Sequence, residues 1–102
     1  MAIEEAAIEN EVRRVFLDRA EALRGHRILM FGSRVSGTAG PLSDFDIGVD
    51  GAEPLDLGLF YEIEEALEQL PTLHRLDWVD LNRASRKVAE SARREGRVLY
   101  EA

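Results

Sequence analysis

Residues 31–51 read FGSRVSGTAGPLSDFDIGVDG and contain the pattern that decides the fold of this 102-residue chain. A Gly-Ser pair stands at 32–33, and residues 32–41 include three glycines and one proline, which is typical of a loop. From Asp44 to Gly51 the sequence then alternates between polar or small residues and apolar ones. Strict alternation predicts a β-strand, because successive side chains of a strand point to opposite faces.

The two faces of this predicted strand differ in character. The apolar face consists of Phe45, Ile47 and Val49, and the polar face consists of Asp44, Asp46, Gly48 and Asp50. We expect the apolar face to pack on the core and the polar face to stay open as a ligand site. Gly48 would keep that open face clear for a bulky ligand.

Predicted helices and strands flank this segment. The first half is expected to hold a helix over 3–24 that stops at Gly25 and a buried strand over 27–31. The second half is expected to hold a helix that opens at Glu53–Pro54 and stops at Pro71, a strand over 74–81, and a helix capped by Ser85 that ends near Glu95 and Gly96. The segment from Arg97 is expected to form either a short edge strand or a packed tail. This order predicts an α/β (α+β) fold, in which helices cover one face of a small mixed β-sheet. The length predicts a single domain over residues 1–102.

Composition narrows the class of protein. The chain has 45% hydrophobic residues, no cysteine and a net charge of −7, so a core is expected, whereas disulfides and thiolate metal sites are excluded. The negative charge argues against direct nucleic-acid binding, which depends on neutralising phosphates with Lys and Arg. No apolar run approaches the roughly 20 residues that span a bilayer, and the acidic N-terminus does not resemble a signal peptide. We therefore expect a cytoplasmic protein without membrane association.

Two carboxylates on the polar face suggest a metal site. Asp44 and Asp46 would lie on the same side of the strand, where their mutual repulsion is unfavourable unless a cation lies between them. Mg²⁺ suits that role, since it binds through one or two carboxylates together with phosphate oxygens and water. The Gly32–Ser33 pair offers backbone N–H groups and a hydroxyl to phosphates. The layout therefore indicates Mg²⁺-nucleotide chemistry.

A two-metal site usually needs a third carboxylate from another strand, and RLDWVDL at 75–81 offers two candidates. Asp77 and Asp80 are three residues apart, so they face opposite sides of a regular strand. Leu76 and Trp78 form the bulkier apolar pair and should face the core, which places Asp80 on the core side. We therefore expect Asp77 to complete the site.

The order Gly32-Ser33, ten residues, and then Asp44-Phe45-Asp46 is the GS-x10-DxD pattern of the polymerase-β-like nucleotidyltransferase superfamily, which this chain resembles. The resemblance is closest to the minimal nucleotidyltransferases (MNT), the antitoxin partners of HEPN ribonuclease toxins. It extends over nearly the whole chain and includes the stretches GSRVSG, SDFDIGV, LDWVDL and REGRVLYE. It implies the polymerase-β-like nucleotidyltransferase fold.

The resemblance also implies roles for particular residues. Asp44 and Asp46 would bind two Mg²⁺ ions, and Asp77 would bind the ion that activates the acceptor hydroxyl. That hydroxyl attacks the α-phosphorus in line, and pyrophosphate leaves. The expected nucleotide-binding residues are Gly32 and Ser33, which would hold the triphosphate of ATP, and Arg34, which would contact the phosphates.

The function implied by the resemblance is that of an adenylyltransferase. It would transfer AMP from ATP to a tyrosine of a HEPN toxin, as the antitoxin of a type VII-like toxin–antitoxin pair, in a hetero-oligomer with that toxin. Two alternatives stay open. The chain could modify a small molecule such as an aminoglycoside, with a homodimer building the acceptor pocket, or it could neutralise its partner by binding alone, through its acidic surface.

Overall fold

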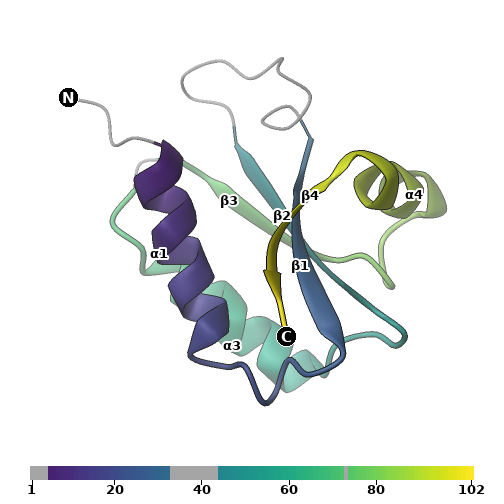
Figure 1. Ribbon diagram of the computed structural model, residues 1–102, viewed down its shortest axis with the longest axis horizontal. Helices are drawn as coiled ribbons and strands as arrows, with labels where there is room; N and C mark the ends of the chain where they lie inside the picture. Colours follow the sequence, from purple (N-terminus) through teal and green to yellow (C-terminus); the bar gives the residue numbers. More distant parts are fainter. Residues whose placement is uncertain (1–4, 33–43, 73) are drawn as a thin grey trace.

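The computed structural model describes residues 5–32, 44–72 and 74–102. Its elements in chain order are α1 (Glu5–Leu17), β1 (His26–Phe31), β2 (Phe45–Gly51), α3 (Leu57–Glu68), β3 (Leu76–Asp80), α4 (Arg86–Glu95) and β4 (Arg97–Glu101). The expected loop over 32–41 lies outside the described residues except for Gly32. Figure 1 shows a central sheet with α1 and α3 on one side and α4 on the other.

The four strands form one mixed sheet in the order β3-β2-β1-β4. β1 pairs antiparallel with β2 and with β4, whereas β2 and β3 run parallel and are joined through α3. Parallel neighbours require such a crossover connection, and a helix is its usual form. The mixed sheet confirms the predicted fold class, and β4 shows that the C-terminal segment forms an edge strand rather than a packed tail.

The alternation in β2 divides the sheet into two faces as expected. Phe45, Ile47 and Val49 are fully buried in the main core, together with apolar residues of α1 and α3. Trp78 of β3 joins the same core, where its ring stacks on Phe60 with centroids 5.3 Å apart. The aspartates of β2 therefore lie on the opposite face of the sheet.

The first helix is shorter than predicted, because α1 ends at Leu17 rather than near residue 24. Residues 18–25 continue as turns, with i→i−3 bonds from Arg19 N to Phe16 O (2.9 Å) and from Ala20 N to Leu17 O (3.2 Å). Such tighter bonds are common where helices end. The predicted helix stop at Gly25 is therefore wrong: Gly25 lies at the end of these turns, directly before β1, with a φ of +87° that a glycine adopts without strain.

The other two helices are placed by their caps. α3 begins at Leu57, later than the predicted opening at Glu53–Pro54, because the Asp56 side chain accepts a hydrogen bond from Leu59 N (3.1 Å) and thereby caps the helix. For α4 the predicted cap is confirmed, since Ser85 accepts a bond from Val88 N. A matching end at Gly96, whose N–H donates to Ala92 O, is also confirmed.

Helices cover both faces of the sheet, although one face was expected to be free of them. α4 packs Ala89 and Ala92 against Leu29 and Leu81 in a second, smaller cluster on the face opposite the main core. This layer also corrects the expected role of Gly48. A Cβ at Gly48 would lie 3.0 Å from Leu81 and 3.1 Å from Phe31, so this glycine admits neighbouring side chains rather than a ligand.

No helix in the described ranges is both long enough and apolar enough to cross a lipid bilayer.

Candidate active site

Partly buried carboxylates of β2 and β3 lie side by side where these two strands begin. Asp46 and Asp77 are register partners in the parallel pair, and both point away from the main core. Asp44 precedes β2 directly, and its charge acts on Asp46. The structure therefore brings together the three carboxylates that the sequence singled out.

The environment of Asp46 disfavours its ionised form. Burial raises the pKa of this carboxyl above its ordinary value of 3.8, and the negative charges of Asp77 and Asp44 and a hydrogen bond with Asp77 raise it further. Both effects are those expected for a carboxylate that is withdrawn from water and placed beside like charges. A cation in this cluster would remove the penalty.

Gly32 closes the cluster from the side of β1. Its φ is +81°, and a Cβ on this residue would overlap with the Asp46 carboxylate at Oδ2. Glycine is thus required here twice, for its backbone conformation and for the close approach of the chain to Asp46. The predicted nucleotide-binding residues Ser33 and Arg34 follow Gly32 in the chain and lie outside the described residues.

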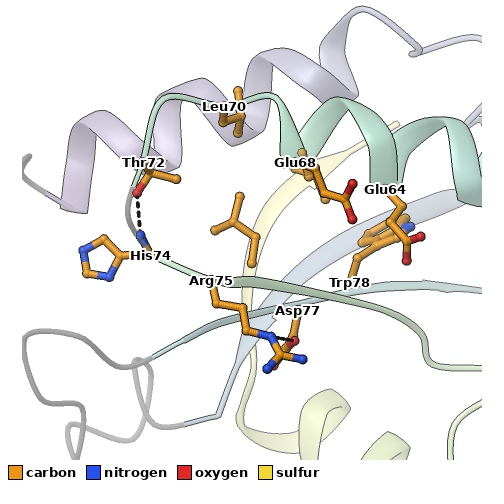
Figure 2. Close-up of a pocket in the computed structure, with 10 residues that line it drawn as sticks. Glu64, Glu68, Leu70, Thr72, His74, Arg75, Asp77 and Trp78 are labelled. Carbon is orange, nitrogen blue, oxygen red and sulfur yellow. Dashed lines mark hydrogen bonds and ion pairs between the residues drawn. The ribbon is translucent and has the colours of Figure 1, made fainter.

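Arg75 was not among the predicted site residues, yet it contacts the cluster. Its Nε lies 3.1 Å from Asp77 Oδ1, and Figure 2 shows this ion pair between Arg75, directly before β3, and Asp77 in β3. Residues two apart in a strand share a face, so the sequence contained a signal for this contact. With Asp77 turned to Arg75, no three acidic, histidine or cysteine side chains within the described ranges are already arranged around one cation position.

Asp80 lies on the core side of the sheet, as predicted from the odd spacing of the two β3 aspartates, and its carboxylate binds groups of the protein itself. It is 4% exposed and accepts hydrogen bonds from Leu55 N (2.8 Å) and Asn82 N (2.9 Å). Arg83 Nε lies 3.4 Å from its Oδ2. These partners satisfy the carboxylate on the core side, where it cannot join the cluster around Asp46.

Asp50, at the far end of the polar face of β2, was expected on an open surface and is buried instead. Arg27 Nε and Arg93 Nε contact its two carboxylate oxygens at 3.2 Å and 2.9 Å. Because α4 supplies Arg93, the cover over this part of the face is the reason for the difference. The open part of the polar face is therefore restricted to the end with Asp44 and Asp46.

The donor set fits divalent magnesium in its chemistry. Carboxylate oxygens are the ligands that Mg²⁺ prefers, and three of them from two adjacent strands would leave further coordination positions to phosphate and water. A cation bound here would lower the pKa of Asp46, which burial and the neighbouring carboxylates raise. Asp77 would have to exchange Arg75 for the cation.

A mixed sheet with three clustered carboxylates beside a glycine turn is the arrangement of an enzyme domain that handles nucleotides with the help of metal ions. The pattern of the family "Polymerase beta, Nucleotidyltransferase" matches residues 4–102. The chain therefore belongs to the polymerase beta nucleotidyltransferase family and is a nucleotidyltransferase domain. A comparison with curated proteins gave no match.

Three solved structures with the same fold are chains of toxin–antitoxin complexes. A chain of a toxin–antitoxin complex with AMP-PNP is 29% identical, with a TM-score of 0.67 over 92% of this chain and 73% of that one. A chain of the MntA–HepT complex is 25% identical, with a TM-score of 0.64 over 96% and 74%. A chain of a Shewanella oneidensis complex, in which a tri-AMPylated HEPN toxin is bound to an MNT antitoxin, is 25% identical, with a TM-score of 0.65 over 97% and 74%.

Proposed function

We propose that this chain transfers AMP from ATP to a tyrosine of a HEPN-family ribonuclease toxin and thereby acts as its antitoxin. The observation that carries the proposal is the carboxylate cluster of Asp44, Asp46 and Asp77 in a nucleotidyltransferase domain. Similar chains occur in complexes that contain AMP-PNP and an AMPylated HEPN toxin. These support both the nucleotide and the acceptor that we assign.

The reaction exchanges one bond for another at the α-phosphorus of ATP. The tyrosine oxygen attacks this phosphorus, the bond to the β-phosphate oxygen breaks, and pyrophosphate leaves with that oxygen. The hydroxyl proton of the tyrosine is released to solvent water. The protein has to orient the attacking oxygen and the leaving group in line and to tolerate the negative charge that gathers between them.

The three aspartates would hold two Mg²⁺ ions, with Asp44 and Asp46 bound to both and Asp77 to the one on the acceptor side. When bound, the ions would offset the charge of the triphosphate and of the acceptor oxygen. Asp46 is the central ligand in this arrangement, since it lies beside both other carboxylates. The register of β2 and β3 fixes its separation from Asp77 before any ligand binds.

Phosphate binding is assigned to the start of the loop after β1. Gly32 has no side chain and approaches Asp46 closely, so its peptide group can face a phosphate that shares the same cation. For Ser33 and Arg34 the proposal rests on the sequence, in which a hydroxyl and a guanidinium follow Gly32 directly. Arg34 would supply positive charge to the phosphates.

The experiment is a transfer assay with Mg²⁺ and a purified HEPN-family toxin protein as the acceptor. ATP labelled in the α-phosphate should label the HEPN protein, whereas ATP labelled in the γ-phosphate should not, because pyrophosphate is released. The Asp46→Asn variant should give no label with either. Label from the γ-phosphate would indicate phosphoryl transfer and contradict the proposal.

A second measurement separates catalysis from simple binding. Co-expression of the HEPN protein with the Asp46→Asn variant should leave cells inhibited, although the two proteins still co-purify. If the variant protects cells as well as the unmodified chain does, neutralisation by binding is the better account.

A further inference from the structure

The outer edge of β3 is unpaired within the described part of the chain, where this strand bonds to β2 alone. Phe45 N donates to Arg75 O and Leu81 N donates to Val49 O, both at 2.9 Å. Alternate residues of a parallel strand bond to the same neighbour, so the peptide groups of Leu76 and Trp78 are directed at the free edge. Open edges of this kind readily accept another strand.

Two hollows lie along this edge and share Trp78 as a lining residue. The first, with a volume of about 360 Å³, lies between α3 and the start of β3, with Glu64 and Glu68 on one side and Asp77 on the other. Figure 2 shows the two glutamates on α3 across from Arg75, directly before β3, and Asp77 in β3. The second, of about 230 Å³, includes Leu57 and Tyr61. We call the two hollows together the β3 edge groove.

The groove combines apolar and acidic surface. Leu57 and Tyr61 are large apolar residues of α3 that remain 49% and 59% exposed. Among the described residues that line the first hollow, the carboxylates of Glu64, Glu68 and Asp77 outnumber the guanidinium of Arg75. A partner with basic and apolar side chains would complement both features, whereas a second copy of this acidic chain would place like charges against each other.

The groove also ends at the candidate active site. Phe31, Asp46 and Asp77 form one cross-strand row on three adjacent strands. A residue that paired with Asp77 from a further strand would continue this row, with its side chain on the same face and about 5 Å away. A segment bound along the edge would therefore bring one of its side chains directly beside Asp77.

We propose that the β3 edge groove docks the acceptor protein, by adding an extended segment of that protein with basic and apolar side chains to the free edge of β3. This inference rests on the proposed function and deepens it, since it assigns the surface through which the acceptor reaches the carboxylates. Backbone hydrogen bonds to β3 would supply affinity, and the contacts with Glu68 and Tyr61 would select the partner.

Matched substitutions on exposed positions test the groove. Glu68→Lys reverses a charge in the groove, and Glu65→Lys makes the same change on the same helix, at an exposed residue outside it. Tyr61→Ala removes exposed apolar surface from the groove, and Leu17→Ala does so on α1, where Leu17 is 62% exposed. Each groove variant should weaken binding of the HEPN protein about tenfold, and each control by less than about twofold.

Hydrogen exchange gives a readout that charge effects at a distance do not reproduce. Binding of the HEPN protein should slow amide exchange in β3 and along α3 and leave α1 and α4 unchanged. Protection confined to α1 or α4, or groove variants that bind like their controls, would overturn the proposal. Protection of β3 in the chain alone, with a dimer in solution, would assign the groove to a second copy.

The two proposals fail in different ways. If the unmodified chain transfers AMP to the HEPN protein while the groove variants bind and react normally, only the docking surface is wrong. If the unmodified chain neither binds nor labels the HEPN protein, both the proposed function and the assignment of the HEPN protein to the groove are wrong.

Discussion

Asp46 and Asp77 face each other as register partners in adjacent parallel strands, and both carboxylates lie on the face of the sheet opposite the main core. Among the described residues, Arg75 alone forms an ion pair with Asp77. One arginine does not neutralise the combined negative charge of the cluster. The sheet thus fixes two like charges beside each other. A protein gains nothing in stability from such an arrangement, which is typical of a site arranged for a ligand.

Replacement of Asp46 by Asn should make the metal-free protein more stable at neutral pH. Because the folded-state pKa of Asp46 is raised, the folded protein holds this proton more tightly than the unfolded chain does. Stability therefore falls as pH rises from the ordinary value of 3.8 through the raised pKa. Thermal unfolding should give a higher Tm for Asp46→Asn at neutral pH, and the difference should shrink below pH 3.8.

Asp18→Asn is the matched control, since Asp18 is exposed and lies outside the cluster. It should leave the Tm unchanged at either pH. With Mg²⁺ and ATP in excess the order should reverse, because only the unmodified site gains stability from the ligands. A lower Tm for metal-free Asp46→Asn at neutral pH would contradict the account of the cluster.

Gly32→Ala should reduce transfer by more than about tenfold and lower stability by about 1–2 kcal/mol, the cost of a left-handed conformation for a residue with a side chain. Gly25→Ala separates the two effects. Gly25 has a similar φ of +87°, but a Cβ added there would meet no atom within 4 Å, whereas the Cβ of an alanine at 32 would displace the Asp46 carboxylate. Equal losses of activity in the two variants would show that only backbone strain matters.

Replacement by alanine should affect mainly stability at Asp80 and mainly activity at Asp77. Asp80→Ala leaves the N–H groups of Leu55 and Asn82 without their acceptor and should cost about 3 kcal/mol of unfolding free energy. Asp77→Ala should change stability by less than about 1 kcal/mol, because its ion pair with the largely exposed Arg75 is weak. Denaturant unfolding measures both values.

Activity provides the second half of this comparison. Asp77→Ala should lose AMP transfer, whereas Asp80→Asn, which retains one acceptor oxygen, should transfer AMP wherever it remains folded. An active Asp77→Ala variant would exclude Asp77 from the site.

Arg75→Ala should strengthen Mg²⁺ binding in the absence of nucleotide. Arg75 is 76% exposed at its side chain and competes with a cation for Asp77 Oδ1. An exposed ion pair contributes about 0.2–1 kcal/mol, so its loss should lower the Kd for Mg²⁺ by roughly 1.4- to 5-fold. Titration calorimetry gives this Kd directly. Weaker Mg²⁺ binding would mean that Arg75 orients Asp77 rather than competing for it.

Much of the fold and of the candidate site could be predicted from the sequence, because side-chain alternation in strands and capping at helix ends depend on residues close together in the chain. Strict alternation in β2 settled its buried face, and the odd spacing of Asp77 and Asp80 placed them on opposite faces once Trp78 was assigned to the core. Ser85 and Gly96 marked the ends of α4 through their capping chemistry.

Other features depend on contacts that the sequence does not display. α4 covers the second face through Ala89 and Ala92, and two alanines in a strongly charged helix give little apolar signal. For the same reason Asp50 and Gly48 were expected on open surface, whereas Arg93 and Leu81 contact them. The early end of α1 was not visible in the sequence, because the apolar periodicity continues to the buried Leu23 although residues after Leu17 form turns.

The most direct test of the central claim is the intact mass of the HEPN protein after incubation with this chain, Mg²⁺ and ATP. The account predicts a gain of one or more AMP units on the HEPN protein, mapped to a tyrosine by peptide fragmentation and absent with Asp77→Asn. An unchanged mass for a HEPN protein that nevertheless binds the unmodified chain tightly would contradict it.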